Sequence, residues 1–450
     1  MKKIFIAIVA TILAYGCAED EFGENSGGLT TVPYSITVNY ETNKPAQNTN
    51  IKLINLGTND SYDLVTDENG FAYLANILPG TYNITATKTM SAEAFKDEFG
   101  FTEAGEEISF NGTLNNTNIN ATFQPGKIKL TQSKTGDLVI KQVYYAGSDT
   151  SKGAVTRDQF IEVYNNSNQV IYADGLYLAL LNTALTTTPT TTNAPYTLPS
   201  GQWDWSKSNG MSITSGDANN DYVYADFVVQ IPGNGTQYPI QPGASIIIAQ
   251  TGINHKEPLT VDGKNYKIDN PELTVDLSMA EFEAYLGDFR KSIGKEPWPT
   301  DLDNPAVPNV NISYWGIPGA YSGVSDLILD TFGRDSFIIF RDENFINYKF
   351  YPLPNVVTVN TTTPHNIQIP VNKIIDGIDT QHFRPANLRP KALPAQIDAS
   401  AINMSNFYNS NSVMRKIKST TPEGRIILED TNNTANDFIE MKANPKGFAQ

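Results

Sequence analysis

The sequence predicts a mostly β protein with long loops and one short amphipathic helix, and three observations support this. Aromatic residues are abundant, with 22 Tyr and 21 Phe in 450 residues. Charged residues make up only 18%, while 32 Gly and 26 Pro interrupt the chain at short intervals. Several segments alternate apolar and polar residues with a period of two. This combination is typical of half-buried strands separated by turns.

The N-terminus has the pattern of an export signal. Lys2 and Lys3 precede residues 4–13, an uncharged apolar run that is too short to span a bilayer. Cys17, the single cysteine, closes this run and has no cysteine with which to form an intramolecular disulfide. A buried free thiol is the alternative. The segment resembles the lipobox of bacterial lipoproteins, which implies a signal peptide at residues 1–16 and a diacylated Cys17 that anchors the mature chain in a membrane.

Three acidic residues, Glu19, Asp20 and Glu21, follow the cysteine. A solvated linker is the alternative, since residues 25–28 continue with linker composition. The run also resembles the acidic export signal of Gram-negative bacteria that are rich in surface lipoproteins. That resemblance implies a lipidated acidic linker over residues 17–32 and a location on the outer face of the outer membrane.

The charge balance argues against one class of partner. Removal of residues 1–16 takes away two of the 32 basic residues and none of the 48 acidic ones, so the formal net charge falls from −16 to −18. A surface of this sign repels phosphate backbones, so we expect no nucleic-acid partner.

The first folded domain is expected over residues 33–125. Strand-like alternation occurs at residues 34–40, 51–54 and 82–86. Asn69-Gly70 supplies a tight turn, after which Phe71 and Tyr73 share one strand face, with Phe71 expected in the core. The segment resembles the carboxypeptidase-regulatory, or transthyretin-like, β-sandwich.

The second domain is expected over residues 137–450. Strand-like segments at residues 138–147, 158–167 and 170–178 are separated by Asn, Asp and Gly turns. The segment Phe-Ile-Glu-Val-Tyr-Asn at residues 160–165 and the strand at residues 244–249 resemble the lamin-tail type of immunoglobulin-like sandwich. Residues 412–416 and 430–438 resemble the end of such domains, which implies an insertion at about residues 183–335.

One helix is expected inside this insertion. Residues 278–281 have capping-box spacing, and apolar side chains follow at i, i+3, i+4 and i+7, namely Phe282, Tyr285, Leu286 and Phe289. The sequence therefore predicts an amphipathic helix that ends near Gly294.

Tryptophans mark a candidate ligand or partner surface. Trp203 and Trp205 form an alternating pair, whose alternative is the buried face of a strand. Trp298 stands between Pro297 and Pro299, which keep it out of a sheet centre and favour an exposed position. Trp315 lies in the same long region.

Catalytic motifs are absent from the sequence. His255, His365 and His382 have no metal-ligand spacing, and neither a nucleophile elbow nor a phosphate loop occurs. We expect no cofactor. Asp217 and Asp221 concentrate oxygen ligands for Ca²⁺ but equally suit a turn.

Taken together, the two domains resemble a family of Gram-negative surface lipoproteins of unknown function, whose members are often encoded near TonB-dependent receptors. This implies a non-enzymatic binding or accessory module for nutrient or metallophore uptake, with a TonB-dependent receptor as partner. The alternative is an extracellular carboxylate-based hydrolase, such as a glycan-degrading enzyme, because such chemistry needs only two carboxylates.

Overall fold

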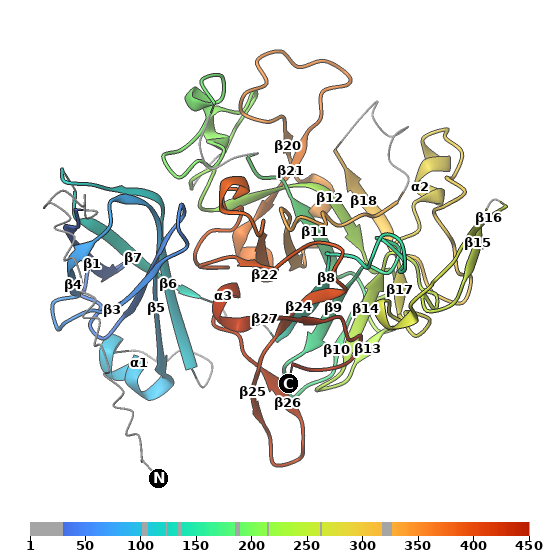
Figure 1. The fold of residues 1–450 in the computed structure, drawn as a ribbon, viewed down its shortest axis with the longest axis horizontal. Coiled ribbons are helices and arrows are strands. Elements are labelled where there is room, and N and C mark those ends of the chain that lie inside the picture. Colours follow the sequence, from blue (N-terminus) through green and yellow to red (C-terminus); the bar gives the residue numbers. More distant parts are fainter. Residues whose placement is uncertain are drawn as a thin grey trace, which may run out of the picture.

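The computed structural model describes residues 30–100, 107–122, 124–133, 137–184, 190–213, 216–261, 263–316 and 326–449. Cys17 and the acidic residues Glu19, Asp20 and Glu21 lie outside the described residues. Figure 1 shows a smaller N-terminal domain beside a larger second domain, both built mainly from strands. The predicted mostly β sandwich fold is confirmed.

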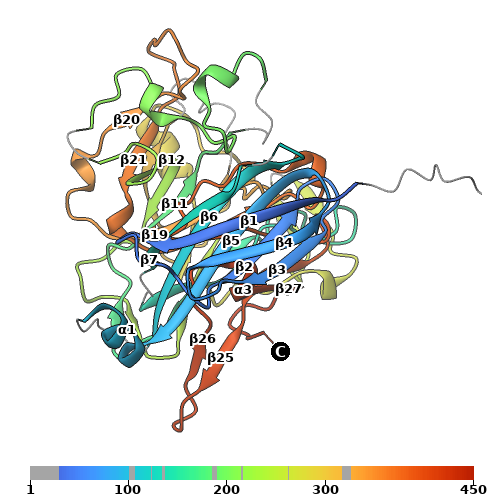
Figure 2. The ribbon, with the colours of Figure 1, turned by 90° about the vertical axis from the view of Figure 1, so that its left-hand side faces the viewer.

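The N-terminal domain is one curved sheet with the strand order β3-β2-β5-β6-β7-β1-β4 (Figure 2). Its strands are β1 (Val32–Tyr40), β2 (Asn50–Asn55), β3 (Ser61–Val65), β4 (Phe71–Ile77), β5 (Gly80–Ser91), β6 (Glu107–Ile119) and β7 (Gly126–Ser133). Ile36 of β1, Ile51 of β2 and Ile84 of β5 belong to one buried core and are at most 1% exposed. The sheet therefore closes around its own hydrophobic face.

The domain ends later than the expected residue 125. Residues 36–40 of β1 pair in parallel with residues 126–130 of β7, and β7 also pairs with β6. β7 thus joins β6 to β1 within the sheet, so residues 126–133 belong to the first domain.

A helix that the sequence analysis did not predict, α1 (Ala92–Phe99), follows β5. The Ser91 hydroxyl caps it by accepting from the Ala94 amide at 3.2 Å. Gly100 ends it in the left-handed region with φ 82°, and Phe95 is buried in the core.

The core assignment of Phe71 is wrong. Phe71 and Tyr73 do share a face of β4, but they are 41% and 56% exposed. Ala72 and Ile77 point inward instead, at 5% and 0% exposure. Period-two alternation identifies which residues share a face, but it does not say which face is covered.

The second domain is a sandwich of two sheets. One sheet has the order β17-β14-β9-β8-β24-β27, and the other β20-β21-β12-β11-β19-β22-β23, with β18 also paired to β12. The strands of the first are β17 (Phe282–Glu283), β14 (Ser245–Ala249), β9 (Phe160–Asn165), β8 (Leu138–Tyr144), β24 (Asn411–Arg415) and β27 (Phe438–Lys442). Those of the second are β20 (Phe350–Tyr351), β21 (Asn366–Pro370), β12 (Tyr222–Gln230), β11 (Tyr177–Leu181), β19 (Ser336–Phe340), β22 (Ile374–Gln381), β23 (Ile402–Asn403) and β18 (Asn311–Trp315).

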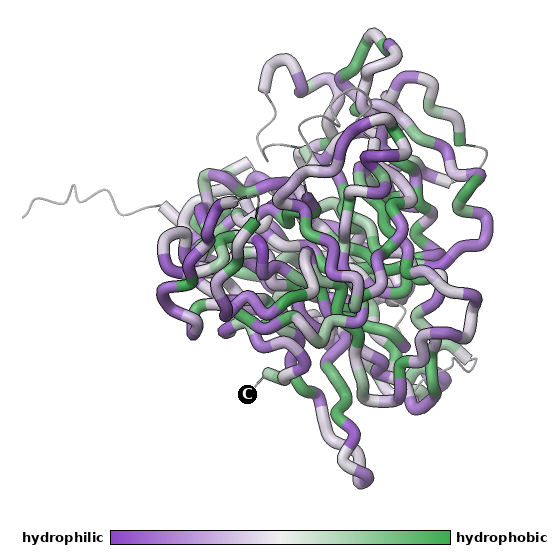
Figure 3. The backbone as a smooth tube through the Cα atoms, turned by 90° about the vertical axis from the view of Figure 1, so that its right-hand side faces the viewer, coloured by the Kyte–Doolittle hydropathy of each residue, from purple (hydrophilic) through white to green (hydrophobic). Residues whose placement is uncertain are grey.

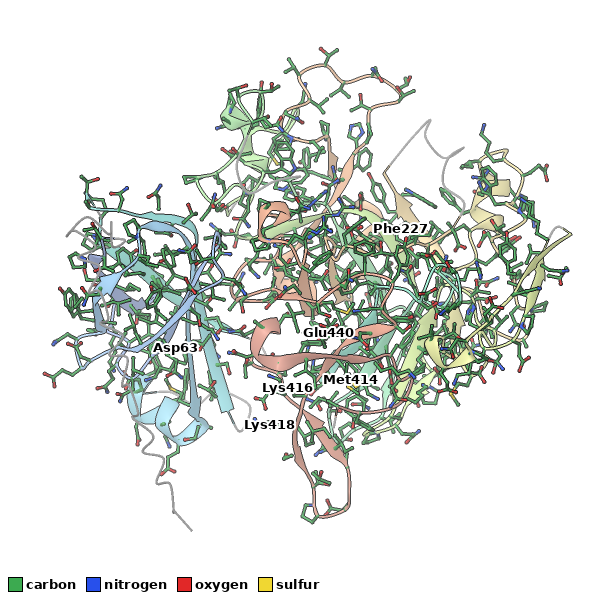
Figure 4. The ribbon with its side chains drawn as sticks, in the orientation of Figure 1. Asp63, Phe227, Met414, Lys416, Lys418 and Glu440 are labelled. Atoms are coloured by element: carbon green, nitrogen blue, oxygen red, sulfur yellow. The ribbon has the colours of Figure 1, made fainter. Side chains whose placement is uncertain are left out.

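The inner faces of the two sheets form one hydrophobic core. Ile140, Val163 and Val413 come from one sheet, whereas Phe227 and Phe337 come from the other. In Figure 3 hydrophobic stretches, drawn in green, run through the interior of this domain among hydrophilic ones, and Figure 4 places Phe227 on the sheet that faces β24 and β27, which carry Met414 and Glu440. Burial between the sheets therefore holds the domain together.

Residues 183–335 are not an insertion between two halves of a sandwich. They supply β12, which pairs with β11, β18 and β21, and β14, which pairs with β9. These strands lie inside the sheets, so the region is part of the sandwich itself.

The predicted amphipathic helix is mostly wrong. Only α2 (Gly287–Ser292) is helical, and Phe282 lies in β17, opposite Ile248 in a parallel pairing. The Glu281 carboxylate accepts from the Ile247 amide at 2.8 Å and contacts the Lys446 ammonium at 2.8 Å, instead of capping a helix. Pairing with β14 has overridden the local helical pattern.

Smaller elements complete the fold. The short strands are β10 (Ile171–Tyr172), β13 (Pro239–Ile240), β15 (Leu259–Val261), β16 (Lys264–Tyr266), β25 (Ile417–Thr420) and β26 (Ile426–Leu428). The short helices are α3 (Thr434–Asp437), η1 (Ala194–Tyr196), η2 (Trp205–Lys207), η3 (Pro271–Leu273), η5 (Phe345–Asn347), η6 (Val371–Lys373) and η7 (Pro385–Asn387). In the described part of the chain, no helix has the length and apolar character needed to cross a membrane.

Candidate functional site

A large cavity lies between the two domains. It has a volume of about 930 Å³ and is lined by residues 112–118 of β6, by Lys129 and Thr131 of β7, and by three segments of the second domain. Those segments are residues 198–202, 219–221 and 393–396. A neighbouring cavity of about 450 Å³ shares Asp221 and Gln396 with it. We call the two cavities together the interdomain groove.

Direct contacts between the domains fix the position of β6. The Asn111 side chain of β6 is 1% exposed, and its Nδ2 donates to the Thr431 carbonyl at 2.9 Å and to the Asn432 carbonyl at 3.2 Å. Because a buried amide with two such bonds is costly to expose, this contact sets the distance between the walls of the groove.

The lining of the larger cavity is polar and carries few charges. Its ionisable side chains are Glu41, Lys129 and Asp221. Most other polar groups are carboxamides and hydroxyls: Asn115, Asn116, Asn118, Gln202, Asn219, Asn220, Gln396, Thr113, Thr117, Thr131 and Ser200. A carboxamide both donates and accepts hydrogen bonds, so this surface suits a neutral ligand rich in hydroxyl or peptide groups.

The Ca²⁺ candidates Asp217 and Asp221 form a turn at the groove wall. Asp217 Oδ1 accepts from the amides of Asn219 at 2.9 Å and Asn220 at 2.8 Å. Asp221 Oδ2 accepts from the Asp217 amide at 2.6 Å. Across the described ranges, no group of three or more His, Cys, Asp or Glu side chains is placed to hold a metal ion. The turn, which was the alternative to Ca²⁺, accounts for both carboxylates.

Trp203 and Trp205 support the groove from behind instead of forming its surface. They are 4% and 6% exposed, and the Trp205 ring stacks on Tyr224 with centroids 3.8 Å apart. The Asn219 side chain joins both residues to the wall, since Nδ2 donates to the Trp203 carbonyl at 2.6 Å and Oδ1 accepts from the Trp205 amide at 3.1 Å. The expected ligand platform is therefore wrong, because these rings pack in a small core of their own.

Trp298 is separate from this site. It is 38% exposed, as the flanking prolines predict, and the Arg290 guanidinium of α2 lies 5.2 Å from its ring centre. Figure 1 shows α2 on the side of the second domain that faces away from the first domain. Trp315 on β18 packs inward, at the edge of Phe227. The tryptophans thus form no common surface.

The three histidines are dispersed and serve local packing. His255 is 3% exposed, its Nε2 lies 3.0 Å from the Thr251 carbonyl oxygen, and burial lowers its pKa to about 4. His382 is stacked between Phe332 and Phe383, and burial also lowers its pKa. The His365 ring meets the edge of Phe350.

The polar wall of β6 was missed from the sequence. The only signal is the segment from Asn111 to Asn118, which alternates poorly and is rich in Asn and Thr. A polar segment without apolar periodicity is more typical of a loop than of a strand. Nothing local indicates that one side faces a second domain.

Comparison with known proteins gives a family of unknown function. Residues 241–445 match the family described as "Protein of unknown function (DUF4876)". A crystal structure of a DUF4876 family protein from Bacteroides thetaiotaomicron VPI-5482 is similar in fold, with a TM-score of 0.50 and 24% sequence identity, over 93% of this chain and 98% of that chain. The expected resemblance to a family of unknown function agrees with this match, while the pairing of two named domains stays a prediction.

Two further structures are far less similar. A DUF3823 family protein from Bacteroides ovatus ATCC 8483 has 13% identity and a TM-score of 0.14, over 48% of this chain and 98% of that chain. A Streptococcal ancillary pilin has 11% identity and a TM-score of 0.15, over 55% of this chain and 61% of that chain. No curated protein matches the sequence.

Proposed function

We propose that this protein is a non-enzymatic binding module, anchored by lipid to the outer face of the outer membrane, whose ligand occupies the interdomain groove. The observation that carries the proposal is the groove itself, a cavity of about 930 Å³ between two domains that contact each other through Asn111. Sites at domain boundaries are common places for ligands, and this volume is ample for an oligosaccharide or peptide segment.

The lining specifies the class of ligand. Carboxamides from both walls, such as Asn115 and Gln396, present donors and acceptors without a large charge. Among the residues that line the larger cavity, Lys129 is the only cation, so a phosphate-rich or strongly anionic ligand would lack counter-charges there. Neutral glycans and peptide backbones carry the complementary groups, so these are the ligands we propose.

The location rests on the sequence. The lipobox-like segment that ends in Cys17 supports a lipid anchor, and Glu19, Asp20 and Glu21 support export to the cell surface. Replacing these three acids with alanine should keep the protein lipidated but protect it from protease added to whole cells. Undiminished surface digestion would show that the acids are only a linker.

The family resemblance supports a TonB-dependent receptor as the partner of this protein. In vivo crosslinking followed by purification of the outer-membrane complex tests it, and recovery of the protein without any receptor would contradict it. The hydrolase alternative stays a prediction.

A direct test uses the soluble mature chain on arrays of oligosaccharides and of short peptides. Gln396 borders both cavities of the groove, so Gln396→Trp should obstruct the groove where they meet and weaken binding of the array ligands at least about tenfold. Thr236→Trp, in an exposed loop before β13, is the matched control and should bind as the wild type does. Cleavage of an array ligand would instead favour the hydrolase.

A further inference from the structure

A smaller cavity lies at the boundary between the two domains, on the side where β22 and the segment after it face the first domain (Figure 1). It has a volume of about 130 Å³. Residues of β2, β5, β6 and the turn after β2 line it on one side, and residues of the segment 381–403 line it on the other. Asn115 is the only residue that lines both this cavity and the interdomain groove. We call the smaller cavity the Arg389 pocket.

Part of the lining of the Arg389 pocket is apolar. Ile54 comes from β2, whose Ile51 and Leu53 are buried in the core of the first domain at 1% and 0% exposure. Because side chains alternate along a strand, Ile54 points to the opposite face, toward the second domain. Phe383 and Leu388 add apolar surface from the second domain. A dry cavity of about 150 Å³ can hold benzene, so this pocket has room for an apolar group of similar size.

Arg389 brings an unsatisfied donor to this pocket. Within the ranges that the structure describes, its Nε is buried and donates no hydrogen bond, and the residue lines the cavity. Lys391 also lines the cavity, but its charge is neutralised, because its ammonium lies 2.6 Å from an Asp379 carboxylate oxygen and 3.7 Å from one of Asp398. Most buried polar atoms in proteins are paired, so the unpaired Nε points to an acceptor that enters the pocket.

The backbone of Arg389 is held in place independently of any ligand. The Gln381 side chain, at the end of β22, donates from Nε2 to the Arg389 carbonyl at 2.5 Å. Its Oε1 accepts from the Arg389 amide at 2.8 Å and from the His382 amide at 3.0 Å. One carboxamide thus satisfies both backbone groups of Arg389. These bonds position the residue beside the pocket and make no use of its guanidinium.

The neighbouring carboxyl groups compensate the charge of Arg389 only in part. Burial lowers the pKa of Arg389 and the charge of Arg334 lowers it further, whereas the charges of Asp330 and Asp335 raise it. Asp330 is already paired, since Arg334 donates to its Oδ1 at 2.9 Å. Burial raises the pKa of Asp335 to about 7, so this carboxyl is only partly ionised at neutral pH. A guanidinium stays protonated even so, and a positive charge therefore remains beside the pocket.

We propose that the Arg389 pocket binds a small organic carboxylate, with the carboxylate on the Arg389 guanidinium and the apolar body against Ile54 and Leu388. A planar guanidinium presents N–H groups in a geometry that matches the two oxygens of a carboxylate. Inorganic phosphate has no apolar part, and the apolar lining would strip water from its charges without replacing it. A neutral amide of the same shape would fit the apolar lining but leave the guanidinium without a counter-charge.

A ligand in the Arg389 pocket would contact both domains. Ile54 and Asn83 belong to the first domain, whereas Leu388 and Ser400 belong to the second. The pocket also differs in chemistry from the interdomain groove, because the groove presents carboxamides to a neutral ligand and the pocket presents a cation beside apolar side chains. The inference therefore does not rest on the proposed function, and different variants test the two.

Isothermal titration calorimetry of the mature chain with benzoate and with hexanoate tests the proposal. Each acid is compared with its uncharged amide, benzamide or hexanamide, and with inorganic phosphate. We expect one saturable site for at least one of the acids, and at least about tenfold weaker binding of its amide and of phosphate. This comparison uses the wild type alone, so it decides the proposal even if a variant does not fold. Equal affinities for acid and amide, or no saturable binding of either acid, would overturn the proposal.

Variants of the mature chain test the role of Arg389 itself. Arg389→Met keeps most of the side-chain length but removes the guanidinium, and should weaken binding of the acid at least about tenfold. Arg425→Met, directly before β26, is the matched control and should bind the acid as the wild type does. Gln396→Trp, in the groove, should also leave acid binding unchanged, which separates this site from the proposed function. Acid binding that survives in Arg389→Met, or that falls equally in Arg425→Met, would contradict the assignment.

Discussion

Replacing Arg415 with methionine should destabilise the second domain more than any surface substitution. Arg415 extends from β24 into the interior and is 1% exposed. Its guanidinium contacts Asp376 Oδ2 at 2.6 Å and Asp437 Oδ2 at 3.5 Å, and its Nε donates to the Ile140 carbonyl at 2.9 Å. Methionine keeps much of the length but leaves three carboxylates, those of Asp376, Asp430 and Asp437, without this counter-charge.

The expected loss of stability follows from the burial of Arg415 together with its carboxylate partners. Breaking a buried ion pair by removing one partner costs about 3 to 5 kcal/mol, because the remaining charge stays in a poor solvent. For a domain of this size each kcal/mol lowers the melting temperature by about 2 °C. We therefore expect the melting transition of the second domain to fall by roughly 6 to 10 °C.

The loss should depend on pH. Burial raises the pKa of Asp376 to about 7 and that of Asp437 to about 6, while Arg415 lowers both. A carboxyl whose folded pKa lies above its unfolded value favours folding at low pH, and this contribution disappears as the pH rises through the folded pKa. Without Arg415 both pKa values rise further, so Arg415→Met should be more destabilising at pH 8 than at pH 5.

Scanning calorimetry of the wild type and the variant at both pH values measures this effect. Arg334→Met is the control, because its partner Asp330 lies in a partly exposed pair that should contribute no more than about 1 kcal/mol. A loss at Arg415→Met as small as that of the control, or one that shrinks as the pH rises, would refute the reasoning.

Three further predictions address the first domain, the anchor and the exposed loop. Ile84→Ala should lower the free energy of unfolding in urea by about 2 to 5 kcal/mol, because Ile84 is fully buried. Phe71→Ala, on the exposed face of β4, should lower it by much less. Similar losses in the two variants would contradict the observed orientation of β4. Cys17→Ala should abolish palmitate labelling, and equal labelling would end the lipoprotein proposal. Trp298→Ala should lower the melting temperature by no more than about 2 °C, since Trp298 is partly exposed and packs against the Arg290 guanidinium near the surface. A larger fall would place its ring in the core.

The strands were the most predictable part of the fold. Residues 160–165 and 245–249 form β9 and β14 as their composition predicts, because β-branched and aromatic side chains fit a buried sheet. The helix expected from Phe282 onward failed for a different reason. Its apolar spacing also suits a short strand beside Ile248, and pairing at that distant position is not encoded in local periodicity.

The candidate site was only partly predictable. Asp221 was found because acidic and amide residues cluster in a short loop, and it does line the groove. The opposite wall on β6 was missed because its position depends on Asn111 contacting Thr431, far away in the sequence.

The most direct test of the central claim is the affinity of the groove for the strongest oligosaccharide or peptide identified on the arrays. Isothermal titration calorimetry should give a measurable affinity for the wild type and for Thr236→Trp, and at least about a tenfold weaker one for Gln396→Trp, which obstructs the groove where its two cavities meet. The ligand should be recovered chemically intact by mass spectrometry after the titration. Equal affinities for the wild type and Gln396→Trp, or recovery of a cleaved ligand, would contradict a non-enzymatic module that binds in the interdomain groove.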